Sequence, residues 1–209
     1  MKTFTLSALA ASMMLLAGCQ STSSTAPVAQ QTSHPSQGVY QVEFSAAHNF
    51  SNQSDKLAAQ MAAYCVDETE LESLKSQWHQ TMVAWMALQG QERGPEKALE
   101  QSWNIQFWPD KKNTTGRKMT ALTGQSKTWT QAQISQQSVT VQGLGSVEWL
   151  LYDRASSLSS SQATCQTGIA IAENIAANAE TIATAWQTNP WVELDEKAWT
   201  SEYLSLIHI

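Results

Sequence analysis

The chain has 209 residues, with 12 basic and 18 acidic side chains, and carries a net charge of −6 at neutral pH. Its basic residues are not clustered, which argues against nucleic acid or an anionic lipid surface as a partner. This length is enough for one domain with a real hydrophobic core, and it leaves room for part of a second domain.

The N-terminus predicts export and lipidation. Lys2 is followed by a short apolar stretch from Leu6 to Leu16, and Ala17-Gly18-Cys19 has the small residues of a cleavage site. This segment resembles a bacterial lipoprotein signal, with residues 1–18 as the signal peptide and acylated Cys19 as the membrane anchor. An ordinary signal peptide with an incidental cysteine is the alternative. Gln20 after the cysteine favours the outer membrane, facing the periplasm, by the sorting habit of such lipoproteins.

Residues 19–37 are rich in Ser, Thr, Gln, Ala and Pro and show no hydrophobic periodicity, so we expect a flexible tether.

Export also determines the expected oxidation state of the cysteines. With Cys19 acylated, Cys65 and Cys165 remain as an even pair in an oxidising compartment, and one disulfide between them is the simplest expectation. Two buried free thiols are the alternative. The sequence has no Cys-x-x-Cys pair, which argues against a cysteine-ligated metal.

The body of the chain has helical periodicity. Residues 54–64 predict a short helix, and residues 71–88 predict a second one, with Asp67 and Glu70 as its capping pair and Gly90 as its stop. Residues 161–187 predict an Ala-rich helix that ends before Pro190. These segments indicate antiparallel helices of a bundle, an all-α fold. Three of the nine tryptophans fall on the apolar stripes, where bundle packing is the best interpretation: Trp78, Trp85 and Trp186.

Residues 141–153, Val-Gln-Gly-Leu-Gly-Ser-Val-Glu-Trp-Leu-Leu-Tyr-Asp, predict a helix entered through Gly143 and Gly145. The apolar residues after Gly145 have helical spacing and form one buried side of the helix. This buried side fixes the direction in which the Glu148 carboxylate points. The segment resembles the signature of the imelysin family, Gly-x-His-x-x-Glu followed by an apolar Leu-Leu stretch. In that family the His and the Glu are one helical turn apart and could share a metal ion.

A second stretch, residues 102–112, has Trp103 and Trp108 ahead of Pro109, which ends any helix, and Asp110 in a predicted turn. It also resembles the imelysin-like lipoproteins, and the resemblance then covers most of residues 57–186. It implies an antiparallel helical bundle of the imelysin-like type, with a second bundle following the first.

Gly145 stands where the family motif has its His. A catalytic zinc ion normally takes three protein ligands, so Glu148 would need partners from other segments. His48 and His79 are the candidates, although neither has metal-ligand spacing. The alternative is that Glu148 lies in a first helical turn and only complements the helix dipole. We single out Gly143, Gly145 and Glu148 as binding residues, with Glu148 as the candidate ligand of a divalent metal or iron.

The last six residues, 204–209, follow a sequence that is typical of a helix interior. Ordinary codons for these residues reproduce the transposon mosaic end that is used as a sequencing adapter. We therefore expect a helical domain over residues 38–203, an adapter-derived tail, and a natural gene that continues into the second bundle.

Three functions remain open. For members with a variant motif, the resemblance implies a ligand- or metal-binding accessory lipoprotein in iron acquisition, with iron-uptake proteins as partners. The second is a zinc-type metallopeptidase, the activity that named the family, and Gly145 counts against it. The third is an envelope scaffold without a small ligand.

Overall fold

The computed structural model describes residues 33–125 and 127–207, and every regular element in these ranges is a helix. The all-α prediction is therefore confirmed for this part of the chain. None of the described helices combines the length and the apolar character that a membrane crossing requires. The predicted signal peptide, Cys19 and most of the predicted tether lie outside the described residues.

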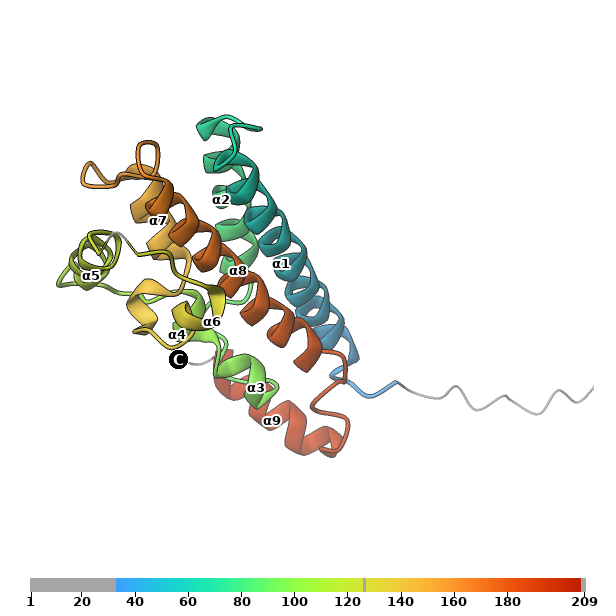
Figure 1. Ribbon diagram of the computed structural model, residues 1–209. Helices are drawn as coiled ribbons and strands as arrows, with labels where there is room; N and C mark the ends of the chain where they lie inside the picture. Colours follow the sequence, from blue (N-terminus) through green and yellow to red (C-terminus); the bar gives the residue numbers. More distant parts are fainter. Residues whose placement is uncertain (1–32, 126, 208–209) are drawn as a thin grey trace, which may run out of the picture. The chain divides into compact units, whose positions relative to one another are not determined.

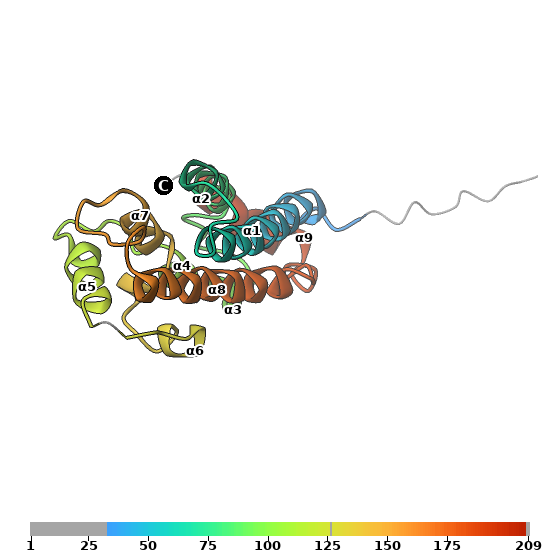
Figure 2. The ribbon, with the colours of Figure 1, turned by 45° about the horizontal axis from the view of Figure 1, so that its top comes forward.

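Three long helices form the centre of the fold: α1 (Gln37–Tyr64), α2 (Leu71–Met86) and α8 (Gln162–Ala185). Helix α1 packs against both of the others, and α8 runs antiparallel to it (Figures 1 and 2). At one end, the Tyr40 hydroxyl donates to the Gln187 carbonyl. Near the middle, Ser51 donates to Glu180 at 3.1 Å. These contacts fix the register of the central helix pair.

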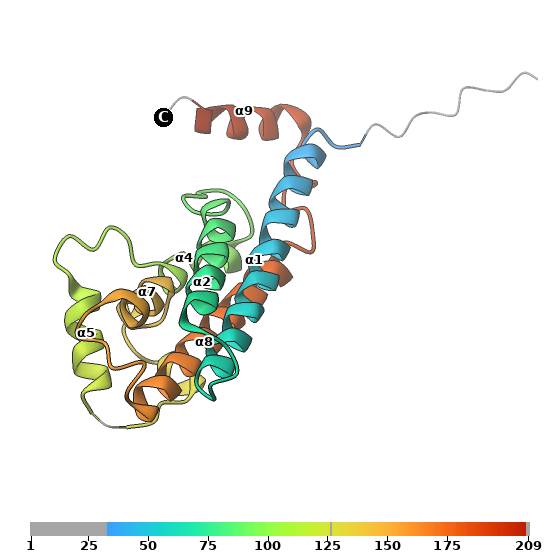
Figure 3. The ribbon, with the colours of Figure 1, turned by 90° about the horizontal axis from the view of Figure 1, so that it is seen from above.

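Shorter helices connect and flank the long ones. In the view of Figure 1, the helices from α4 to α7 lie to the left of α8, and Figure 3 shows α9 crossing near the start of α1 and running past the loop that follows α2. Their bounds are α3 Glu96–Leu99, α4 Ser102–Ile105, α5 Thr114–Thr123, α6 Gln131–Ile134, the 3-10 helix η1 Val139–Val141, α7 Leu144–Tyr152 and α9 Glu196–Ile207.

The hydrophobic core lies where the predicted apolar stripes meet. Trp85 and Trp186 are buried, as their spacing predicts, and Phe50 packs against Trp85 with ring centroids 5.3 Å apart. Helix α8 approaches α1 closely because its facing residues are small. At Gly168, an added Cβ would lie 3.0 Å from the sulfur of Met61.

Helix α1 is longer than predicted, because it begins at Gln37 rather than near Ser54. The apolar stripe continues backwards through Ala47, which is fully buried, to the half-buried Tyr40. The packed region starts even earlier. Ser36 is buried and accepts a hydrogen bond from Asn189 Nδ2 at 2.9 Å, so the end of the predicted tether belongs to the folded body.

The predicted capping pair at Asp67 and Glu70 is wrong. Asp67 adopts a left-handed conformation with φ 58°, and its N–H donates to the Tyr64 carbonyl at 3.1 Å. Together with the hydrogen bond from Glu68 N–H to the Ala63 carbonyl, this arrangement closes the C-terminus of α1. Glu70 is the N-cap of α2, but its side chain makes no capping bond. The predicted Ala-rich helix is confirmed as α8, whose N-cap Ser161 accepts from the Thr164 N–H.

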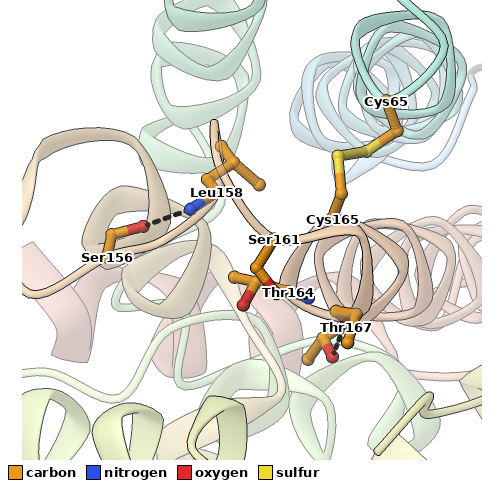
Figure 4. The surroundings of a disulfide bond; sticks show 8 residues. Cys65, Ser156, Leu158, Ser161, Thr164, Cys165 and Thr167 are labelled. Atoms are coloured by element: carbon orange, nitrogen blue, oxygen red, sulfur yellow. Dashed lines mark hydrogen bonds between the residues drawn. A yellow bond between two sulfur atoms is a disulfide. The ribbon is translucent and has the colours of Figure 1, made fainter. Parts of the chain in front are cut away.

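The predicted disulfide between Cys65 and Cys165 is confirmed (Figure 4). Cys65 directly follows α1, and Cys165 lies in the first turns of α8, with the two Cα atoms 5.7 Å apart. The bond therefore ties the end of the first long helix to the start of the last one. On the chain-entropy model, closing a loop of this length stabilises the fold by about 4 to 5 kcal/mol.

Candidate binding groove

Gly143 brings two distant stretches of the sequence together. It is the N-cap of α7, and it lies against the carbonyl groups at the end of α4. A Cβ at this position would clash with the Ile105 carbonyl oxygen and would lie 2.6 Å from that of Asn104. Only glycine fits this approach without a backbone shift. Because Gly143 has no side chain, the Trp103–Trp108 stretch and α7 can lie side by side.

The predicted buried side of α7 is confirmed. Val147 and Leu150 are buried, and Trp78 Nε1 donates to the Leu144 carbonyl at 3.1 Å, which joins α7 to α2. Glu148 points to the opposite side and is exposed. Because α7 begins at Leu144, Glu148 falls in the second helical turn, not in the first. This position weakens the interpretation of Glu148 as a helix-dipole partner, since that effect falls off beyond the first turn.

An open groove of about 350 Å³ lies beside the exposed side of α7, between this helix and the segment that leads into α5. Two exposed aromatic side chains and three carboxylates contribute to its lining: Trp108, Tyr152, Asp110, Glu148 and Asp153. No lysine or arginine belongs to the described lining residues. The groove is therefore acidic, which suits a ligand with positive charge, and of its two exposed aromatic rings Tyr152 already has the Lys75 ammonium group 5.2 Å from its centroid.

Gly145 also lines this groove, one helical turn before Glu148. A Cβ built on Gly145 meets no atom within 4 Å, so the position is open toward the groove. Within the described residues, the Glu148 carboxylate has no hydrogen bond or ion pair. The structure thus brings Gly145 and Glu148 together at one surface, whereas Gly143 is buried and shapes the backbone beneath them.

Two anchored side chains define the walls of the groove. Asp110 accepts hydrogen bonds from the backbone N–H groups of Thr114 and Thr115, both at 2.8 Å, and so fixes the start of α5. Desolvation acts to raise the pKa of Asp110, but these hydrogen bonds outweigh it, and the pKa is lowered. On the other side, Tyr152 contacts Trp78 edge-on, with ring centroids 5.6 Å apart. The two walls therefore rest on different helices.

The predicted histidine partners of Glu148 do not reach the groove. His48 is half-buried on α1, where its ring lies 4.3 Å from that of Phe44, and His79 is exposed on α2. Neither lines the groove. In the described residues, no group of three or more His, Cys, Asp or Glu side chains could hold a metal ion. The donor set therefore does not fit a catalytic zinc site, which normally takes three protein ligands.

Sequence reasoning missed two contributors to this surface. Trp78 fits the core stripe of α2, but it is only partly buried, and its indole N–H supports the first turn of α7. Tyr152 lies within the motif stretch, yet its exposure, 53%, is not evident from the pattern. An aromatic residue at the polar end of an otherwise apolar helix is the signal that could have identified it.

The chain matches the family model described as Imelysin over residues 45–207. No curated protein matches the chain. Among solved structures, an imelysin-like protein from Psychrobacter arcticum 273-4 is similar in fold, with a TM-score of 0.62 and 22% sequence identity. The similarity covers 69% of this chain and 46% of that one, so this chain spans about half of the length of that protein.

Proposed function

Because the chain belongs to the imelysin family, we propose that it is an exported, ligand-binding accessory lipoprotein in iron acquisition, and not an active peptidase. The observation that carries this proposal is the pairing of Gly145 and Glu148 at one open surface. The carboxylate of the family motif is kept and exposed to a ligand, while the imidazole that would complete a metal pair is lost.

The composition of the groove supports ligand binding rather than a passive role in an envelope scaffold. Trp108 is 64% exposed, a costly placement for an indole that no described element covers. The carboxylates of Glu148 and Asp153 lie along the same surface, without a basic residue in the described lining. A positively charged ligand, such as a metal ion with its remaining water ligands or a cationic iron chelate, would compensate these charges.

The proposed location is the outer membrane, facing the periplasm, through acylated Cys19. Proteins of iron uptake are the proposed partners. The location is tested by Cys19→Ser, which we expect to release the protein from the membrane fraction and to leave the far-UV circular dichroism of the helices unchanged. Unaltered membrane association of this variant would contradict the lipoprotein part of the proposal.

The binding role is tested by titrating the full chain with ferrous ammonium sulfate in the absence of oxygen and with zinc chloride, which both supply the metal as a hydrated cation. Glu148→Gln keeps the shape of the side chain and removes its charge, so we expect it to weaken binding of the ferrous ion by about tenfold or more, equivalent to about 1.4 kcal/mol. The matched control is Glu173→Gln, an exposed position on α8 outside the groove lining. Equal affinities in the two variants would contradict a binding role of Glu148.

The role in iron acquisition needs a separate measurement in the source organism. We expect the transcript to rise under iron starvation and to fall when ferric citrate is restored. A peptide-hydrolysis assay in the presence of zinc tests the peptidase alternative, and we expect no activity above that of Glu148→Gln. Activity that this substitution abolishes would favour the peptidase instead.

A further inference from the structure

A second pocket shares no lining residue with the groove. It lies between the start of α1, the loop after α2, and α9, and its volume is about 290 Å³. This volume is near the lower end of the range for small-molecule sites, about 300 to 1,000 Å³. Three aromatic residues contribute to its wall: Trp191, Trp199 and Tyr203.

These aromatic rings are held in place by their neighbours. Trp199 and Tyr203 are one turn apart in α9 and stack with ring centroids 5.2 Å apart and an interplanar angle of 14°. Trp191 packs edge-on against the fully buried Trp186, with centroids 5.5 Å apart. The rings are therefore fixed before any ligand arrives, which reduces the entropy cost of binding. The face of an aromatic ring attracts cations within about 6 Å of its centroid.

The charged side chains that line this pocket are predominantly acidic. Arg93 is the one basic residue among the described lining residues, and its Nη1 lies 3.4 Å from Glu202 Oε2. The carboxylates of Glu43 and Glu92 remain without a basic partner in this lining. Gln91 Nε2 donates to Glu43, which fixes the orientation of that carboxylate. Burial raises the pKa of Glu43, so its charge lacks full compensation in the absence of a ligand.

We propose that this pocket binds a small, soluble organic cation through its ammonium group. The Glu43 carboxylate is the counter-charge, and the rings of Trp199 and Tyr203 form the wall. A quaternary ammonium group fits this combination because it is weakly hydrated and has no N–H donors that need acceptors, and because aromatic rings with a nearby carboxylate are a common way of recognising it. A neutral molecule of the same shape would gain the contacts with the rings and leave Glu43 uncompensated.

A comparison of choline with 3,3-dimethylbutan-1-ol, in which a neutral carbon replaces the quaternary nitrogen, distinguishes the effect of the charge from that of the shape. In isothermal titration calorimetry with the full chain, we expect choline to bind and its isostere to bind at least about tenfold more weakly, a difference of about 1.4 kcal/mol. Equal binding of the two compounds, or no binding of choline, would overturn the proposal.

Substitutions at Glu43 and Tyr203 test whether choline binds in this pocket. Glu43→Gln keeps the acceptor for Gln91 and removes the charge, so choline affinity should fall by about tenfold. Tyr203→Phe should retain choline binding, because the ring face carries the interaction, whereas Tyr203→Leu should weaken it. Glu173→Gln, which lies outside the linings of both pockets, is the control and should leave choline affinity unchanged. A loss in Glu148→Gln, with Glu43→Gln unaffected, would assign the cation to the groove and refute this site.

Discussion

Gly143 lies so close to the Ile105 carbonyl oxygen that no side chain fits between them. This contact joins the start of α7 to the end of α4 and thereby sets the position of the Trp108 wall relative to Glu148. Glycine at this position is therefore a requirement of packing, although the backbone has an ordinary negative φ of −118°.

Gly143→Ala should lower the free energy of unfolding by about 1 to 3 kcal/mol, because the new methyl group forces a backbone shift in a packed region. The matched control is Gly38→Ala on α1, where an added Cβ meets nothing within 4 Å. That control should be neutral or slightly stabilising. Urea unfolding of both variants measures the difference, and equal midpoints would contradict the packing argument.

Gly145→His should restore the His-x-x-Glu pair without loss of the fold, because the position is open toward the groove. We expect zinc affinity to rise over that of the natural chain, since an imidazole and a carboxylate one helical turn apart can share a metal ion. Gly145→Ala is the control for the change in helix propensity. Calorimetry with zinc chloride decides the outcome, and an unchanged affinity in a folded Gly145→His variant would mean that the groove no longer supports metal.

Asp110→Ala should destabilise the fold by about 0.5 to 2 kcal/mol at neutral pH, the usual cost of removing a side chain that caps a helix N-terminus. The pKa of Asp110 is lowered in the folded state. Its contribution is therefore complete above the ordinary aspartate pKa and is lost as pH falls through the lower folded pKa. Unfolding curves of the two proteins should converge in acid. A difference that does not change with pH would contradict this role.

The contribution of Glu43 to stability depends on pH in the opposite direction to that of Asp110, because burial raises the pKa of Glu43 in the folded state. The contribution of Glu43 to stability is present below its unfolded pKa and is lost as pH rises through the folded pKa. Glu43→Gln should therefore unfold at a higher urea concentration than the natural chain at neutral pH, and the gain should vanish in acid. A variant that is less stable at neutral pH would show that another charge already compensates the carboxylate.

The sequence predicts α8 and the core tryptophans well because Ile171, Ile175 and Ile182 repeat with helical spacing and are buried. The first half of α1 is harder to predict, since its exposed positions combine Gln41 and Ser45, residue types that also fill the tether, with the apolar Val42, which obscures the apolar stripe. The groove could be predicted only in part. The motif identifies Gly145 and Glu148, but the position of Trp108 depends on the contact at Gly143, which is a tertiary relationship that no local pattern encodes.

The Cys65–Cys165 bond keeps the protein in one covalent piece after a single proteolytic cut between the two cysteines. Helices α4 to α7, and with them both walls of the groove, lie between the two cysteines in the sequence. A protease that cuts one exposed loop in this interval leaves two fragments that are still one covalent molecule. Nicked protein should therefore run as an intact chain on a gel without reductant and separate into two bands when reductant is added. In a compartment with proteases, a single cut would not release either wall.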